Sequence, residues 1–104
     1  MNGYQLTFYT QQDRSHGSSS LAEWILNCAR EQGAMGGTLF TAESGFGHDR
    51  RLHSAHFFEL ADQPVCVVMA VDAEACERIL NTIRLASIDV FYVKMPIEYG
   101  RTGA

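Results

Sequence analysis

Apolar residues recur along the chain with the spacing of four β-strands. From Tyr4 to Tyr9 apolar and polar side chains alternate, which is the period of a strand with one buried face. Met35 to Glu43 predicts a second strand and Val90 to Ile97 the last one. Val65 to Val71 is apolar throughout, as expected for a central strand covered on at least one face.

Two segments between these strands have helical spacing. Ser20 and Glu23 form a capping box that predicts the start of the first helix, and Gly33 predicts its end. Asp72 is a favourable N-cap for the second helix. Each helix presents one apolar face. The residues are Leu21, Trp24, Ile25, Cys28 and Ala29 in the first helix, and Ala75, Cys76, Ile79, Leu80 and Ile83 in the second.

The remaining segments have the composition of loops. Thr10 to Ser19 is polar and predicts a loop before the first helix. Gly45-Phe46-Gly47 predicts a turn, because glycine adopts backbone angles that other residues resist and lets a ligand approach the main chain. Ala55 to Leu60 has the pattern of one further short strand, whereas Tyr99 to Ala104 has no periodicity.

The predicted order is strand, helix, strand, strand, helix, strand. Two β-α-β halves in this order are the ferredoxin-like plan, an α+β fold, here with a long loop between the second and third strands. Right-handed crossovers would place both helices on one face of an antiparallel sheet. Apolar residues of 65–71 and 90–99 would then lie on the uncovered face, so we expect a homo-oligomer. No linker or repeat divides residues 1–104, which predicts a single domain.

Composition and charge narrow the function. The chain has 104 residues and a net charge of −4, so a general basic footprint for nucleic acid is absent. No apolar run approaches the roughly 18 residues of a membrane span, and residues 1–5 lack the features of a signal peptide. We therefore expect a cytoplasmic protein without membrane insertion. Cys28, Cys66 and Cys76 fall in apolar patterns with no Cys-x-x-Cys pair, which predicts buried, reduced thiols.

The segment after the second strand carries the candidate chemistry. Gly45 and Gly47 fit either a simple tight turn or close contact with a ligand. Phe46 could stack on a base or cap the core. Arg50 and Arg51 are either solvated loop charges or a site for an anion or a target protein.

Other side chains suggest alternatives. Thr38 is either an ordinary strand residue or a hydroxyl that hydrogen-bonds a ligand. His48, His53 and His56, with Glu43 and Asp49 nearby, suggest a metal site. On a strand, however, His53 and His56 would point to opposite faces, so a shared ion would need symmetry-related copies. No nucleophile motif or P-loop is present, so we expect a regulatory binding protein and not an enzyme.

Several short pieces, in their order and spacing, resemble the PII-like (GlnB-like) superfamily, most closely its branch called domain of unknown function 190. The pieces are Asp13-Arg14, Leu21-Ala22-Glu23, Ala29-Arg30-Glu31-x-Gly33, Gly36-Gly37-Thr38, Gly45-Phe46-Gly47, Leu52-His53-Ser54-Ala55, Leu60-x-x-x-Pro64-Val65 and Asp72. The resemblance implies a homotrimer that binds an adenine nucleotide or related small effector between subunits. It also implies a T-loop, here about Ser44 to Asp62, that regulates a partner protein such as a transporter or an enzyme.

One loop departs from the signalling members of this superfamily. They carry a glycine- and lysine-rich phosphate loop before the last strand, where this chain has residues 84–89 with neither residue type. Backbone donors and positive charge for a triphosphate are therefore missing, which favours AMP, ADP or cyclic AMP over ATP. Arg101-Thr102-Gly103 resembles the superfamily's tail, whose arginines contact phosphates.

The sequence thus predicts a small-effector sensor whose cleft lies beside the second strand, the Gly-Phe-Gly segment and a neighbour's last strand. The expected ligand-binding residues are Gly37, Thr38, Ser44, Gly45, Phe46, Gly47, Arg50, Arg51 and Arg101. Two alternatives stay open at this point. One is a trimeric metal-binding protein that uses His48, His53 and His56, and the other is a small enzyme in the same cleft.

Overall fold

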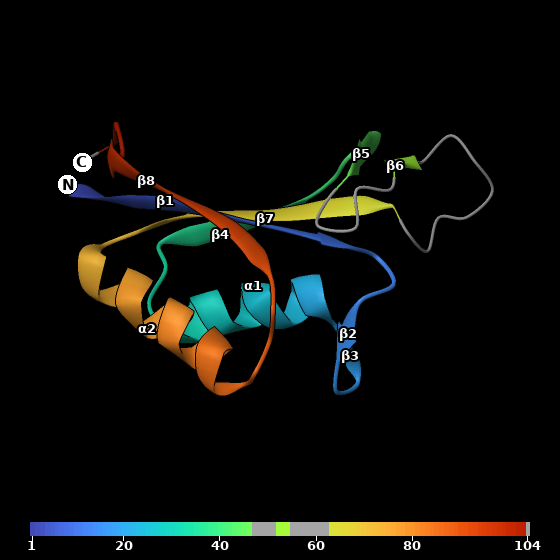
Figure 1. Ribbon diagram of the computed structural model, residues 1–104. Helices are drawn as coiled ribbons and strands as arrows, with labels where there is room; N and C mark the ends of the chain where they lie inside the picture. Colours follow the sequence, from blue (N-terminus) through green and yellow to red (C-terminus); the bar gives the residue numbers. More distant parts are fainter. Residues whose placement is uncertain (47–51, 55–62, 104) are drawn as a thin grey trace.

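The computed structural model describes residues 1–46 and 63–103, together with the backbone of residues 52–54. These residues form a four-stranded sheet, two helices and two short hairpins (Figure 1). The elements in chain order are β1 (Asn2–Gln11), β2 (Ser15–His16), β3 (Ser19–Ser20), α1 (Leu21–Glu31), β4 (Gly36–Thr41), β5 (Ser44–Phe46), β6 (Leu52–Ser54), β7 (Pro64–Val71), α2 (Ala73–Leu85) and β8 (Phe91–Glu98).

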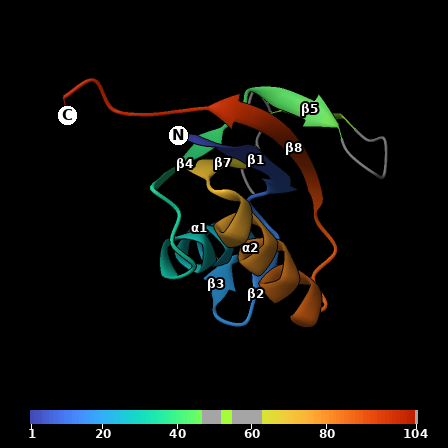
Figure 2. The same ribbon diagram turned by 90° about the vertical axis from the view of Figure 1, so that its left-hand side faces the viewer.

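The sheet has the strand order β4-β7-β1-β8, and each neighbouring pair is antiparallel. Both helices lie on the same face of this sheet (Figures 1 and 2). The two β-α-β halves therefore interleave, because β1 of the first half pairs with both strands of the second. The predicted ferredoxin-like α+β fold is confirmed.

The core lies between the sheet and the helices. Along β7 burial alternates, with Val65, Val67, Met69 and Val71 buried and the residues between them half-buried. The predicted apolar face of α2 is buried in full, and in α1 only Trp24 is left partly exposed. Full burial of one large aliphatic side chain contributes about 1.5–3 kcal/mol, so this alternation fixes which face of the sheet the helices cover.

Both helices start at the residues that the sequence predicts. The Ser20 hydroxyl accepts a hydrogen bond from the Glu23 amide at 3.2 Å, and Asp72 Oδ1 accepts one from the Ala75 amide at 2.7 Å. Each cap satisfies one of the amides that a helix leaves without an intrahelical partner.

Both helices also end in the same motif, in which a residue with positive φ follows the last turn. After α1 this residue is Gly33, with φ of 96°, and the next amide, Ala34, donates to the Ala29 carbonyl at 3.0 Å. After α2 it is Ser87, with φ of 58°, and Ile88 donates to Ile83 at 3.3 Å. These are Schellman motifs, for which glycine is the usual residue at the positive-φ position.

Some predicted boundaries are wrong. Within the predicted loop from Thr10 to Ser19, β1 continues to Gln11, and β2 and β3 form a small hairpin. This hairpin packs on α1, because the ring of His16 meets Trp24 edge-on with centroids 4.9 Å apart. The second predicted strand is shorter than 35–43 and covers Gly36–Thr41. The strand predicted at 55–60 lies outside the described residues.

Candidate functional site

The sheet face opposite the helices is apolar and exposed. Phe40, Cys66, Tyr9 and Phe91 pair in register and form one row across all four strands. Phe40 is 50% exposed, Tyr9 47% and Phe91 68%, and the rings of Tyr9 and Phe91 lie 5.8 Å apart. Val93 and Met95 extend the same face along β8 and are also exposed. Neither α1 nor α2 covers this open face, so its apolar side chains are left exposed within the part of the chain that the structure describes (Figure 1).

The predicted Gly-Phe-Gly turn is wrong in its described part. Gly45 and Phe46 belong to strand β5, where Gly45 pairs with His53 and Phe46 with Leu52 of β6. Gly45 has no positive φ, and a Cβ added there would lie 3.6 Å from Cγ of Pro64, an ordinary contact. The segment is therefore one arm of a hairpin whose connection lies outside the described residues. Phe46 is 68% exposed, so it does not cap the core.

Gly37 and Thr38 are neighbours on β4 but point to opposite faces of the sheet. Thr38 pairs with Val68 and lies on the open face, where it is exposed. A Cβ at Gly37 would approach Cδ1 of Leu26 on α1 to 2.9 Å. Gly37 thus allows β4 to pack closely on the first helix, and its contribution on the helix side is structural.

Within one protomer, the remaining predicted ligand residues lie far apart. Ser44, Gly45 and Phe46 lie beyond the end of β4 that pairs with Val65, whereas Arg101 follows the end of β8 that pairs with Asn2. Because β1 spans the full sheet between these ends, the β5 hairpin and the carboxy-terminal tail lie at opposite ends of the protomer (Figure 1). Gly47, Arg50 and Arg51 lie outside the described residues.

The turn between α2 and β8 holds little positive charge. Arg84, in the last turn of α2, donates to Asn81 Oδ1 at 3.2 Å and is exposed. Ser87 occupies the left-handed position and Asp89 adds a negative charge. The expected preference for AMP, ADP or cyclic AMP over ATP stays a prediction.

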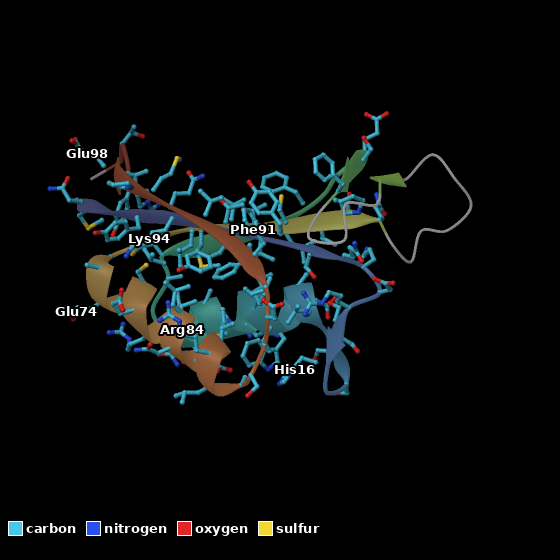
Figure 3. All side chains as sticks on the ribbon, viewed as in Figure 1. His16, Glu74, Arg84, Phe91, Lys94 and Glu98 are labelled. Atoms are coloured by element: carbon cyan, nitrogen blue, oxygen red, sulfur yellow. The ribbon has the colours of Figure 1, made fainter. Side chains whose placement is uncertain are left out.

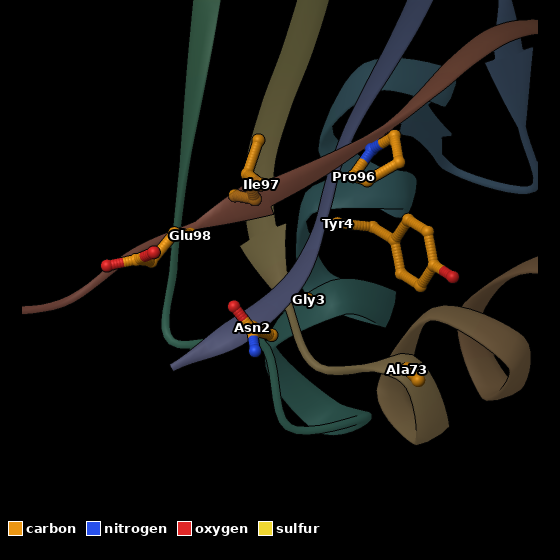
Figure 4. A pocket seen from close by; sticks show the side chains of 7 residues that line it. All are labelled: Asn2, Gly3, Tyr4, Ala73, Pro96, Ile97 and Glu98. Atoms are coloured by element: carbon orange, nitrogen blue, oxygen red, sulfur yellow. The ribbon is translucent and has the colours of Figure 1, made fainter.

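A shallow hollow of about 450 Å³ opens between the start of β1, the end of β8 and the start of α2 (Figure 4). Tyr4, Ala73 and Pro96 give it apolar walls, and Glu98 is the charged residue of its lining. A carboxylate repels phosphate, and the hollow lies at the end of the protomer away from β5. We therefore do not assign the nucleotide to it.

Lys94 lies between β8 and α2 (Figure 3). Its Nζ is 3.7 Å from a carboxylate oxygen of Glu77 and 4.3 Å from the centroid of the Tyr4 ring. Such a cation is attracted by both the carboxylate and the π face. The pairing directs Lys94 toward the helix layer and away from the open face.

The cysteines are free thiols, as the sequence predicts, but only Cys28 and Cys76 are buried, and Cys66 is half-buried. Burial raises the pKa of all three thiols above the usual value. For Cys28 the charge of Glu31 adds to the rise in pKa, whereas for Cys76 Lys94 opposes it. A raised pKa keeps these thiols protonated and unreactive near neutral pH.

Within the described residues there is no group of three or more His, Cys, Asp and Glu side chains able to hold a metal ion. The alternative metal ligands, His48, His56 and the side chain of His53, lie outside the described residues. Among the described helices, none is long and apolar enough to cross a membrane.

Sequence reasoning missed Gly3 and Tyr99 as a pair. A Cβ at Gly3 would overlap the Val71 carbonyl oxygen and lie 2.8 Å from Cε1 of Tyr99. The sequence pattern contains no signal of this contact, because Gly3 precedes the predicted strand 4–9, although a glycine inside a strand often marks a close approach. The sequence groups Tyr99 with a tail of no periodicity, whereas in the structure its backbone pairs with Met1 beside β8.

Comparison with known proteins identifies relatives along nearly the whole chain. Residues 3–93 match the model of a family, DUF190, described as "Uncharacterized ACR". A UPF0166 protein of Aquifex aeolicus (strain VF5) is 27% identical over 97 residues, covering 85% of this chain and 92% of the relative.

Solved structures share the fold. One is CPII, a nitrogen regulatory PII-like protein from Thiomonas intermedia K12, in a structure bound to ADP, AMP and bicarbonate. It matches with a TM-score of 0.72 and 17% identity, over 97% of this chain and 91% of CPII. A putative PII-like signaling protein from Thermus thermophilus matches with a TM-score of 0.68 and 16% identity, over 93% of this chain and 88% of the other.

Proposed function

The chain belongs to the DUF190 family, and from this premise we propose that it is a PII-like sensor. Three copies assemble through the open face of the sheet, and an adenine nucleotide binds in the clefts between them. The loop from Ser44 to Asp62 responds to the nucleotide and regulates a partner protein. We place the ligand beside Thr38, Ser44, Gly45 and Phe46 of one subunit, together with Gly47, Arg50 and Arg51 of the same loop. Arg101 of a neighbouring subunit completes the cleft.

The observation that carries this proposal is the exposed row of Phe40, Tyr9 and Phe91 on a sheet face that neither α1 nor α2 covers. Burying such a face against other copies removes apolar area from water, at about 25 cal/mol per Å². Assembly also supplies what one protomer lacks. The β5 hairpin and the tail with Arg101 lie at opposite ends of one protomer, so only a neighbour can bring them together.

The expected ligand is AMP, ADP or cyclic AMP. Support comes from the α2–β8 turn, because residues 84–89 contain neither the glycine nor the lysine of a phosphate loop that would hold a triphosphate. The fold relative CPII was solved with ADP, AMP and bicarbonate, which makes bicarbonate a second ligand to test. A nucleotide shifts the loop only by as much as it binds one loop conformation better than the other.

Calorimetry with AMP, ADP, ATP and cyclic AMP, each with and without bicarbonate, tests the proposal on the purified protein. We expect at least one of AMP, ADP and cyclic AMP to bind at micromolar concentration and more tightly than ATP. Phe46→Ala and Arg101→Ala should each weaken that binding about tenfold, which corresponds to roughly 1.4 kcal/mol. Asn81→Ala, a change on the exposed side of α2, is the matched control and should leave affinity unchanged. Absence of binding by all four nucleotides at millimolar concentration would contradict the proposal.

A further inference from the structure

Tyr99, just beyond β8, is the last residue whose backbone is hydrogen-bonded to the sheet. The Tyr99 amide donates to the Met1 carbonyl at 2.8 Å, and the Met1 nitrogen donates to the Tyr99 carbonyl at 2.8 Å. These two bonds extend the β1–β8 ladder by one residue beyond the pair of Asn2 and Glu98. Tyr99 therefore marks where the chain changes from sheet to tail.

The side chain of Tyr99 makes a second attachment, to Gly3. A Cβ at Gly3 would lie 2.8 Å from Cε1 of Tyr99, so the ring occupies the space that a larger residue would need. An aromatic ring that covers a glycine on the neighbouring strand protects the exposed backbone and fixes the local register. Tyr99 is half-buried in consequence, whereas Glu98 and Gly100 on either side of it are exposed.

Beyond Tyr99 nothing in the described chain holds the tail. Residues 100–103 are all exposed, and a Cβ at Gly100 or Gly103 would meet no atom within 4 Å. Figure 2 shows this segment continuing away from the body of the protomer. Arg101 follows Tyr99 by two residues, and two residues span at most about 7 Å. The position of Tyr99 thus limits where the Arg101 guanidinium can reach.

We propose that Tyr99, packed on Gly3, is a positioning residue that directs Arg101 at the phosphate of a nucleotide bound to the neighbouring subunit. This inference rests on the proposed function. Without the ring, the pair of Tyr99 and Met1 at the end of the ladder frays, and a longer flexible segment must be ordered when Arg101 binds. The ordering lowers affinity for the phosphate, because lost chain freedom opposes binding.

The test compares Tyr99→Ala with the matched control Tyr99→Phe, which keeps the ring and loses only the hydroxyl. Affinities for AMP and for adenosine are measured on the full assembled protein, with assembly checked by light scattering. Tyr99→Ala should weaken AMP binding about three- to tenfold, the range expected for coupling between residues that act together. Adenosine carries no phosphate, so its affinity should not change, and Tyr99→Phe should resemble the wild type for both ligands.

A double-mutant cycle with Arg101→Ala separates positioning from a general structural role. If Tyr99 acts through Arg101, Tyr99→Ala has no further effect on AMP affinity once Arg101 is alanine. An equal loss of AMP and adenosine affinity, or a loss that persists in the Arg101→Ala background, would overturn the inference. Wild-type protein that binds neither AMP nor ADP would instead overturn the proposed function.

In that case proteolysis alone tests whether the Tyr99 ring holds the start of the tail. Trypsin should release residues 102–104 from Tyr99→Ala faster than from Tyr99→Phe, since a frayed tail enters the protease more readily. Equal rates for the two variants would show that the ring does not hold the tail, and this result would also overturn the inference.

Discussion

Gly33 and Ser87 end the two helices with the same pattern of hydrogen bonds, but the backbone strain differs between them. Both have positive φ, 96° for Gly33 and 58° for Ser87. Glycine enters this region freely, whereas a residue with a Cβ meets the following carbonyl oxygen there. The motif after α2 persists because Ile88 packs against the core and donates to Ile83 at 3.3 Å. Packing thus offsets the backbone strain at Ser87.

Replacing Ser87 by glycine should stabilise the protein by about 0.5–1 kcal/mol, the relief of a left-handed conformation less the added freedom of the unfolded chain. Ser87→Ala keeps the Cβ and should show no such gain. Gly33→Ala should destabilise by about 1 kcal/mol. Urea unfolding at one fixed protein concentration measures all three variants. A Ser87→Gly protein less stable than wild type would show that the serine hydroxyl outweighs the strain.

At the scale of elements, the segments that could be predicted from the sequence are those with one buried face. Strands such as β7 and helices such as α2 have one face in the core, so their periods are visible in the sequence. The hairpins β2–β3 and β5–β6 have only two or three residues in each strand, so they are too short to leave a period to detect. Their geometry depends on contacts remote in sequence, such as Gly45 against Pro64. The separation of Arg101 from β5 depends likewise on strand order, which only the folded sheet fixes.

Two of the three glycines expected at the ligand site, Gly37 and Gly45, should differ in how they tolerate a methyl group. A Cβ at Gly37 approaches Leu26 Cδ1 to 2.9 Å, so the end of the half-buried Leu26 side chain must shift, whereas a Cβ at Gly45 meets Pro64 Cγ at 3.6 Å. Gly37→Ala should therefore lower the free energy of unfolding by about 1 kcal/mol. Gly45→Ala should change it by less than about 0.5 kcal/mol. Thermal unfolding of both variants measures this, and equal destabilisation would mean that β5 packs more tightly than its contact with Pro64 indicates.

Substitution of Gly45 also separates an effect on ligand binding from an effect on stability. If a nucleotide approaches the β5 backbone, Gly45→Ala should weaken its binding while leaving the fold intact. Gly37→Ala should act mainly on stability, since its Cβ points to the helix layer. The same two proteins, measured by calorimetry with AMP, thus show whether the ligand contacts β5 directly.

At the scale of the molecule, sheet topology produces both the open face and the need for a partner. Helices on a single face leave Phe40, Tyr9 and Phe91 uncovered, and the antiparallel order places β5 and the tail at opposite ends. Assembly through the open face would cover its apolar side chains and would bring β5 of one subunit near the tail of another. Oligomerisation and nucleotide binding should then be lost together when the open face is changed.

Val93→Glu tests this coupling, because Val93 lies on the open face opposite Thr7 and is 37% exposed. A carboxylate buried there in each copy would lack a partner and would cost several kcal/mol per copy, so the variant should be monomeric by light scattering. It should also lose nucleotide affinity more than tenfold, because a lone protomer cannot bring Arg101 to the β5 hairpin. Leu85→Glu is the matched control: Leu85 is apolar and 87% exposed at the end of α2, so its replacement should leave assembly and binding unchanged. A monomeric Val93→Glu protein that still binds AMP at full strength would place the nucleotide within one subunit, and an assembled one would place the interface elsewhere.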